Sequence, residues 1–103
     1  LQVAGVKFDK LIAIGGGTDS HYWCELIATV LGVPLLLPKN SDFAVALGAA
    51  RLALCATTGA NPVEIMTPPI FAKEIAPNIQ HKNAYDEEYK RFRKLYPLLK
   101  ELN

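Results

Sequence analysis

The chain has 103 residues, half of them hydrophobic and a fifth charged, with a formal net charge of +1. This length allows one small domain with a modest core, and the composition is typical of a globular protein. A near-neutral charge without a basic block argues against nucleic acid as the main partner, and the apolar runs are too short to span a bilayer. No signal-peptide pattern opens the chain, so we expect a cytoplasmic protein that binds neither nucleic acid nor membrane.

The start of the chain and its cysteines indicate its context. The first residue, Leu1, is not a methionine, and a strand follows soon after it, so we expect a fragment of a longer protein. Cys24 and Cys55 fall within predicted helices among apolar neighbours. This setting favours reduced, packed thiols over a disulfide or a reactive site.

A strand, a glycine turn and a helix start follow one another between residues 10 and 23. Residues 10–14 form a nearly continuous apolar run, which predicts a parallel strand covered on both faces. Three glycines follow, and then Asp19 and Ser20, which are good helix N-caps. Glycines let the backbone approach a ligand, and a helix N-terminus offers N–H groups to an anion, so the stretch predicts a phosphate or nucleotide site. A tight β-to-α turn with no ligand explains the same residues equally well.

The next elements complete a strand–helix–strand unit. Apolar side chains at positions 23, 26, 27, 30 and 31 share one helical stripe, which we expect to face the core. Gly32 supplies a C-terminal stop, Pro34 lies just beyond it, and residues 33–37 form a second predicted strand. The unit is therefore a parallel crossover, which is expected to be right-handed.

A second helix is predicted over residues 43–57 and a third over residues 84–94. Gly48 costs the second helix about 1 kcal/mol relative to alanine, so we expect something to pack closely there, the sheet or a ligand. Residues 58–83 are rich in proline, show little periodicity and are expected to run across another part of the molecule. Pro97 is expected to kink or end the last helix just before it.

This inventory of two strands and three helices is too small for an independently stable sheet. We expect the missing strands to come from upstream sequence or from a second copy of the chain. Surface that is meant for them would favour self-association, so a homo-oligomer is expected.

Three motifs carry a resemblance to a known family. They are Ile-Gly-Gly-Gly-Thr-Asp-Ser-His-Tyr-Trp at 14–23, Leu-Gly-Val-Pro at 31–34 and Ala-Leu-Gly-Ala-Ala-Arg-Leu-Ala at 46–53. In this order and spacing they resemble the C-terminal lobe of the FGGY carbohydrate kinases, and within that family they are most similar to the bacterial xylulokinases. Residues 85–96 resemble the last helix of those enzymes.

The resemblance implies an α/β fold, namely part of the C-terminal lobe of an actin-like ATPase (ribonuclease H-like) fold, with strand–helix–strand–helix and a C-terminal helix. It implies that residues 1–58 are half of the nucleotide-binding lobe. Residues 59–83 would be a proline-rich connection, and residues 84–103 the C-terminal helix.

The resemblance also implies a nucleotide site on the glycine turn. Gly15, Gly16 and Gly17 would lie against the adenosine and α-phosphate of ATP. Thr18, Ser20 and His21 would be further contacts to the ribose or adenine, and the helix around position 48 would support the site from beneath. The chain departs from the xylulokinases at Thr18 and the residue after it, because they usually carry a small residue and a basic one there. The carboxylate of residue 19 would repel a phosphate at the same place.

The activity that the resemblance implies is ATP- and Mg²⁺-dependent phosphorylation of D-xylulose to D-xylulose 5-phosphate by the full-length enzyme. The general base and the sugar pocket of the family lie upstream, so no catalytic residue is assigned to this chain. Phosphoryl transfer needs in-line positioning and charge stabilisation, which half a cleft does not supply. We therefore expect the isolated chain to be inactive.

The residues alone also allow other interpretations. The chain could be a non-catalytic oligomerisation or partner-binding module with a structural glycine turn. A dinucleotide-binding unit is disfavoured, because the glycines do not follow Gly-x-Gly-x-x-Gly and Pro38 and Lys39, not an acidic residue, follow the second strand. A P-loop is excluded, because the sequence has no Gly-Lys-Ser/Thr.

Overall fold

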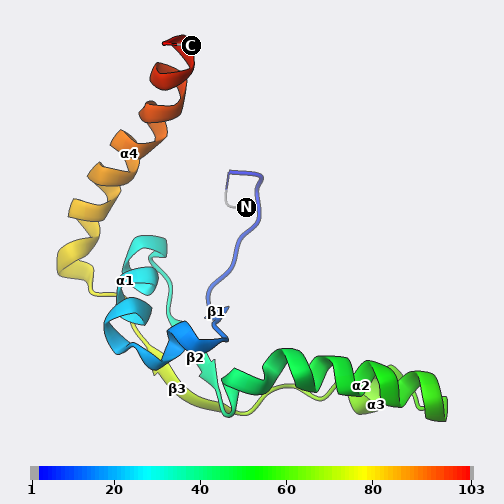
Figure 1. The fold of residues 1–103 in the computed structure, drawn as a ribbon. Helices are drawn as coiled ribbons and strands as arrows, with labels where there is room; N and C mark the ends of the chain where they lie inside the picture. The colour runs from blue at the N-terminus through cyan, green and yellow to red at the C-terminus, as the bar shows by residue number, and fades with distance from the viewer. Residues whose placement is uncertain (1–2, 103) are drawn as a thin grey trace.

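The computed structural model describes residues 3–102 and is built around a small mixed sheet (Figure 1). The strands β1 (Leu11–Ile12), β2 (Leu35–Pro38) and β3 (Phe71–Ile75) lie in that order across it. β1 is parallel to β2, and β3 is antiparallel to β2. The predicted N-terminal tail and last helix reach residues 1, 2 and 103, which lie outside the described residues.

The predicted parallel crossover is confirmed, with shorter strands. The helix α1 (His21–Leu31) joins β1 to β2, which pair with Leu11 opposite Leu35. Ser20 caps the helix, because its side chain accepts a hydrogen bond from the Trp23 amide. Gly32 ends it with a φ of 71°, a left-handed conformation that glycine adopts without a steric penalty. Both helix ends therefore follow from local sequence.

A compact apolar core lies between α1 and the sheet. It consists of Cys24, Ala28, Leu35, Leu37 and Ile75. The predicted core stripe of α1 is confirmed at Ile27, which packs against this core, and is wrong at Trp23, which remains 49% exposed. The small side chains at 24 and 28 face the sheet instead. Small side chains let the helix lie close to the strands, which is why they occupy the buried face.

The segment predicted to have little regular structure contains a short helix, α3 (Pro62–Ile65), and the third strand. The expectation of two strands is therefore wrong, because β3 comes from this chain itself. β3 pairs with β2 from Ile75 opposite Leu35 to Phe71 opposite Pro38. Its strand structure comes from that pairing, since four of its five residues are exposed and show no alternation.

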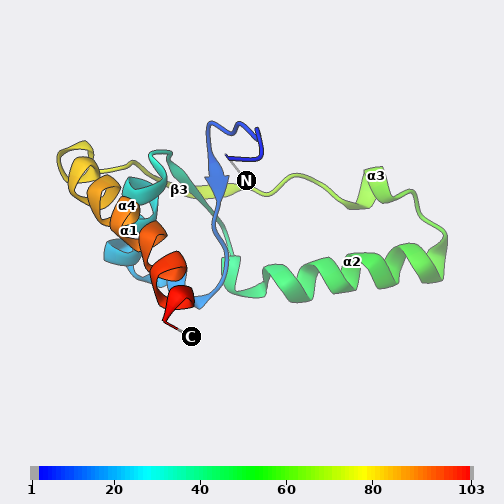
Figure 2. The ribbon, with the colours of Figure 1, turned by 90° about the horizontal axis from the view of Figure 1, so that it is seen from above.

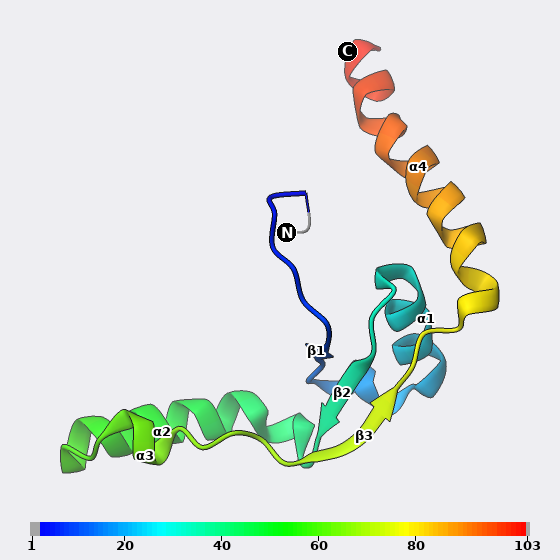
Figure 3. The ribbon, with the colours of Figure 1, turned by 180° about the vertical axis from the view of Figure 1, so that it is seen from behind.

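Two helical arms project from this centre (Figures 2 and 3). One arm is α2 (Ala44–Thr58), close to the predicted helix 43–57, and α3 contacts it before the chain returns to β3. The other arm is α4 (Ile79–Glu101). The radius of gyration is 18.3 Å, against about 13 Å for a compact domain of this length. Much apolar side-chain surface on both arms is exposed as a result.

The arm α4 differs from its prediction at both ends. It begins at Ile79, five residues earlier than expected, because Asn78 caps it by accepting from the Gln80 amide. It also continues through Pro97 instead of ending there. On an exposed helix, water can pair with the carbonyl that proline leaves without a donor. Within the described residues, no helix is both long and apolar enough to cross a membrane.

The start of α4 is fastened to α1 by one buried side chain. Thr29 is 1% exposed, and its Oγ1 accepts a hydrogen bond from the Asn78 amide at 2.9 Å. The same hydroxyl donates to the carbonyl of Glu25 at 2.6 Å. Farther along α4, a hydrogen bond to the carboxylate of Glu87 raises the pKa of Lys90. The second half of α4 points away from the central sheet (Figures 1 and 3).

Candidate functional site

The glycine turn lies where the chain leaves β1. Gly15 has a φ of 98° and a ψ of 173°, a backbone conformation that is essentially restricted to glycine. Gly16 and Gly17 begin a single 3-10 turn, η1 (Gly16–Asp19). A Cβ at position 15 or 16 would meet nothing within 4 Å, so this side of the turn is open. Within residues 3–102, the amides of Gly16 and Gly17 have no hydrogen-bond partner. The turn therefore presents two free donors next to the end of a parallel strand.

Thr18 stabilises this turn through several hydrogen bonds. Its Oγ1 donates to the carbonyl of Gly15 at 2.7 Å, and its amide donates to the same carbonyl at 3.1 Å. Its Oγ1 also lies 3.1 Å from Ser41 Oγ, in the 3-10 turn η2 (Ser41–Phe43) that follows β2. The thiol of the buried Cys24 donates to its carbonyl at 3.6 Å. The two turns at the carboxyl ends of β1 and β2 are thus joined.

The other two predicted contact residues lie at the start of α1. The hydroxyl of Ser20 accepts from the Trp23 amide at 3.1 Å, so it serves as the helix cap and its own proton remains to donate elsewhere. The side chain of His21 is 73% exposed, and its Nε2 lies 3.6 Å from Glu25 Oε2. The structure thus places the six predicted site residues along one turn and one helix end.

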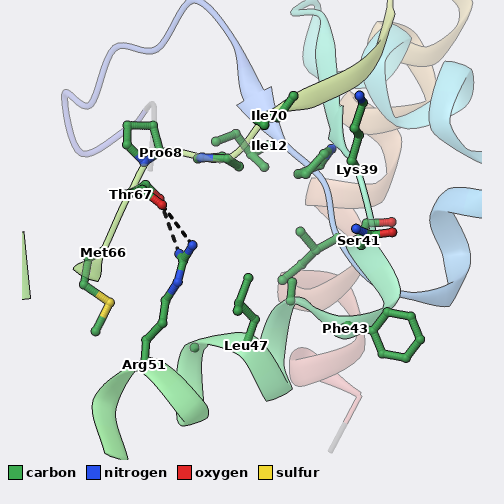
Figure 4. A pocket seen from close by; sticks show the side chains of 16 residues that line it. Ile12, Lys39, Ser41, Phe43, Leu47, Arg51, Met66, Thr67, Pro68 and Ile70 are labelled. Atoms are coloured by element: carbon green, nitrogen blue, oxygen red, sulfur yellow. Dashed lines mark hydrogen bonds between the residues drawn. The ribbon is translucent and has the colours of Figure 1, made fainter. Parts of the chain in front are cut away.

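A separate hollow lies beside this turn (Figure 4). It has a volume of about 820 Å³. Its walls come from β1, the turn after β2, α2 and the chain that returns from α3. None of the six predicted site residues lines it, but Ile14 and Ser41, which adjoin or bond them, do. The full lining is Ile12, Ile14, Pro38, Lys39, Asn40, Ser41, Phe43, Ala44, Leu47, Gly48, Arg51, Met66, Thr67, Pro68, Pro69 and Ile70.

The charged side chains that line the hollow are all positive. Lys39 and Arg51 contribute cations, and the lining contains no aspartate or glutamate. The guanidinium of Arg51 reaches across to Thr67, with 3.3 Å to its carbonyl oxygen and 3.0 Å to its Oγ1 (Figure 4). This contact holds the returning chain against α2. The rest of the wall is largely apolar, so the hollow suits an apolar group that carries negative charge.

The close packing predicted at Gly48 is not found within the described residues. A Cβ there would meet nothing within 4 Å, because Gly48 faces the hollow. The small side chains around Gly48 are a signal in the sequence of an accessible helix backbone. The link from Arg51 to Thr67 had no such signal, because it joins residues sixteen positions apart across a segment with no periodicity. In residues 3–102 no three metal-ligating side chains gather in one place.

Comparison with known proteins assigns this chain to a family. Residues 1–57 match the family model for the C-terminal domain of the FGGY family of carbohydrate kinases. The chain belongs to the FGGY family. The predicted fold class is confirmed, since the mixed α/β structure of this FGGY chain is part of the C-terminal lobe of an actin-like ATPase fold.

Individual relatives match this FGGY chain over nearly its whole length. A solved xyloylose kinase from Brucella ovis is 50% identical with a TM-score of 0.79, over 99% of this chain and 22% of that one. Xylulose kinase of Escherichia coli K12 is 34% identical over 96% of this chain and 21% of its own length. Autoinducer-2 kinase of Klebsiella pneumoniae is 31% identical over 92% of this chain and 18% of its own length. The FGGY chain therefore spans about a fifth of the length of these relatives.

Proposed function

We propose that this chain is the nucleotide-binding C-terminal part of an ATP-dependent sugar kinase that converts D-xylulose to D-xylulose 5-phosphate. The observation that carries the proposal is the glycine turn: a Gly15 conformation reserved for glycine, followed by two free amides, at the carboxyl end of a parallel strand. Ligands of open α/β sheets bind outside the carboxyl ends of the strands. Membership of a kinase family supports the assignment of that ligand as a nucleotide.

In this proposal Gly15, Gly16 and Gly17 approach the adenosine and α-phosphate of ATP. The open space above the first two lets a ligand reach the backbone, which fits such a role. Ser20 and His21, at the start of α1, would contact the ribose or adenine with the free Ser20 hydroxyl proton and the exposed imidazole.

Two further residues modulate this proposed site. Thr18, the third proposed contact to the ribose or adenine, also acts on the turn itself, because its Oγ1 donates a hydrogen bond to the carbonyl of Gly15. Asp19 is exposed in the same turn, and its charge would weaken binding of a triphosphate more than that of adenosine.

The chemistry of phosphoryl transfer is assigned to the longer polypeptide. ATP supplies the transferred phosphoryl group, and Mg²⁺ neutralises charge on it in such reactions. We propose that the general base and the residues that bind Mg²⁺ lie elsewhere in the longer polypeptide, and we assign neither role to this chain. This chain would bind and orient the nucleotide, and we propose that it is inactive alone. Purified chain that phosphorylated a sugar would contradict this part of the proposal.

D-xylulose is the proposed sugar because a relative that is 50% identical is named a xyloylose kinase, and another is a xylulose kinase. Autoinducer-2 is the competing substrate, since an autoinducer-2 kinase is 31% identical. A full-length kinase carrying this segment, assayed with both compounds and Mg-ATP, tests the choice. We expect kcat/KM for D-xylulose to exceed that for autoinducer-2 by at least about 100-fold, the discrimination that hydrogen-bonding pockets reach readily. The reverse order would overturn the assignment.

A second candidate is a non-catalytic oligomerisation or partner-binding module. The observation that favours it is the exposed apolar surface of the two arms, for example Phe92 at 68% and Leu52 at 64%. Light scattering of the purified chain tests self-association, for which a dimer is expected and a monomer at high concentration would count against it. A rise in thermal stability on adding Mg-ADP would favour the kinase proposal over this one.

A further inference from the structure

Two hydroxyl groups form a relay that joins the glycine turn to the turn after β2. Thr18 Oγ1 donates its hydrogen bond to the carbonyl of Gly15 at 2.7 Å, and it lies 3.1 Å from Ser41 Oγ. A hydroxyl has a single proton to donate. Because Thr18 gives that proton to Gly15, Ser41 must be the donor of the second hydrogen bond. The direction of the relay therefore runs from Ser41 through Thr18 to Gly15.

A glycine turn needs such a contact to hold one conformation. Glycine loses more conformational freedom on folding than any other residue, so three in succession cost the most entropy to order. Most contacts that order this turn are local, from Thr18 itself and from Cys24 in the adjoining helix. Ser41 contributes from 23 positions away, on a different strand end. Its hydrogen bond fixes the turn relative to the sheet.

We propose that Ser41 is a positioning residue, which acts through Thr18 to hold the amides of Gly16 and Gly17 in the arrangement that receives the nucleotide. The proposal rests on the proposed function of the turn. It adds a residue from outside the glycine motif to the nucleotide site, with no direct contact between Ser41 and the nucleotide.

Four variants of the chain test the relay. Ser41→Ala removes the hydroxyl that donates to Thr18. Thr18→Val removes both hydrogen bonds of the Thr18 hydroxyl and keeps a branched side chain. Ser41→Thr restores a hydroxyl and serves as the rescue. Thr57→Val is the matched control, because Thr57 Oγ1 also donates to a backbone carbonyl, that of Ala53 at 2.9 Å, but in α2 and away from the turn.

Two readouts are measured on each ¹⁵N-labelled variant. The first is amide hydrogen exchange at residues 18 and 20, whose N–H groups donate to the carbonyls of Gly15 and Gly17. The second is the dissociation constant for Mg-ADP from amide shifts. We expect Ser41→Ala to accelerate the exchange and to weaken Mg-ADP binding by about three- to tenfold, the range of one net hydrogen bond. Thr18→Val should change both readouts at least as strongly. The double variant, with Ser41→Ala and Thr18→Val together, should change them no more than Thr18→Val alone, because the two residues act in one chain of hydrogen bonds.

The outcomes separate the relay from the nucleotide site. Faster exchange and weaker Mg-ADP binding in Ser41→Ala support the proposal, provided that Ser41→Thr and Thr57→Val keep the wild-type exchange rates and dissociation constant. Binding and exchange in Ser41→Ala within twofold of wild type would overturn it. If the wild-type chain does not bind Mg-ADP, the proposed function of the isolated turn fails, and the positioning role of Ser41 toward a nucleotide fails with it. Exchange at residues 18 and 20 then still reports whether the hydroxyl relay holds the turn.

Discussion

The conformation of Gly15 makes a prediction that separates two neighbouring glycines. Gly15 has a φ of 98°, whereas Gly16 is not among the glycines with positive φ. A Cβ at either position would meet nothing within 4 Å. Gly15→Ala and Gly16→Ala therefore differ in backbone strain and not in steric contacts.

The magnitudes follow from two opposing terms. A non-glycine residue in the region that Gly15 occupies costs about 1–3 kcal/mol. Replacing any glycine by alanine also lowers the entropy of the unfolded chain, which stabilises the fold by about 0.4–1 kcal/mol where the backbone is compatible. We expect Gly15→Ala to lower the free energy of unfolding by about 1–2 kcal/mol, and Gly16→Ala to leave it unchanged or raise it by less than about 1 kcal/mol.

The assay is urea unfolding followed by the fluorescence of Trp23, the single tryptophan of the chain. Its ring packs beside the turn, with Cδ1 3.5 Å from the position of a Cβ on Gly17. A lower midpoint with an unchanged m-value in Gly15→Ala, and not in Gly16→Ala, is the predicted result. Equal midpoints for the two variants would refute the assignment of a glycine-only backbone to position 15.

Three further substitutions test the core and the caps. Leu35→Ala truncates a side chain that is 2% exposed and should lower the free energy of unfolding by about 2–5 kcal/mol in urea titrations. Thr29→Val should cost about 0.5–1.5 kcal/mol by removing the buried hydroxyl that accepts from the partly exposed Asn78 amide, and should speed hydrogen exchange at the start of α4. Ser20→Ala should cost about 1 kcal/mol by removing the acceptor of the Trp23 amide, with circular dichroism recording the lost helix stability.

Conservative partners control two of these substitutions. Thr29→Ser and Ser20→Asp each keep an acceptor, so both should remain near the wild-type stability. A loss in Thr29→Ser as large as that in Thr29→Val would show that the methyl group, not the hydrogen bond, fastens α4. A wild-type midpoint for Leu35→Ala would contradict the core described between α1 and the sheet.

Local sequence patterns predicted the first half of the fold. The apolar runs before and after α1, the Ser20 cap and the Gly32 stop are all signals within a few residues, and each is confirmed. The core face of α1 was predicted only in part, because Trp23 outweighed the smaller Ala28 in the pattern. Which face of a crossover helix is buried depends on how it lies on the sheet, and the helix alone does not contain that information.

The second half required tertiary information. Residues 71–75 are a strand only because β2 offers an edge, and their own sequence has neither alternation nor a strong β preference. The early start of α4 did have a signal in Asn78, a good N-cap after a proline, but the polar residues that follow it hid the helix. At the candidate site the glycine turn was visible in the sequence, while Ser41 was not, because a 23-residue separation brings it there.

The most direct test of the account is a titration of the ¹⁵N-labelled chain with Mg-ADP, followed through its amide shifts. A nucleotide site on the glycine turn predicts saturable shifts confined to residues 15–21 and the segment around Ser41, with the largest at the free amides of Gly16 and Gly17. Saturable shifts confined instead to the hollow around Arg51, or no shifts in a folded sample, would contradict a nucleotide site on the glycine turn of this chain.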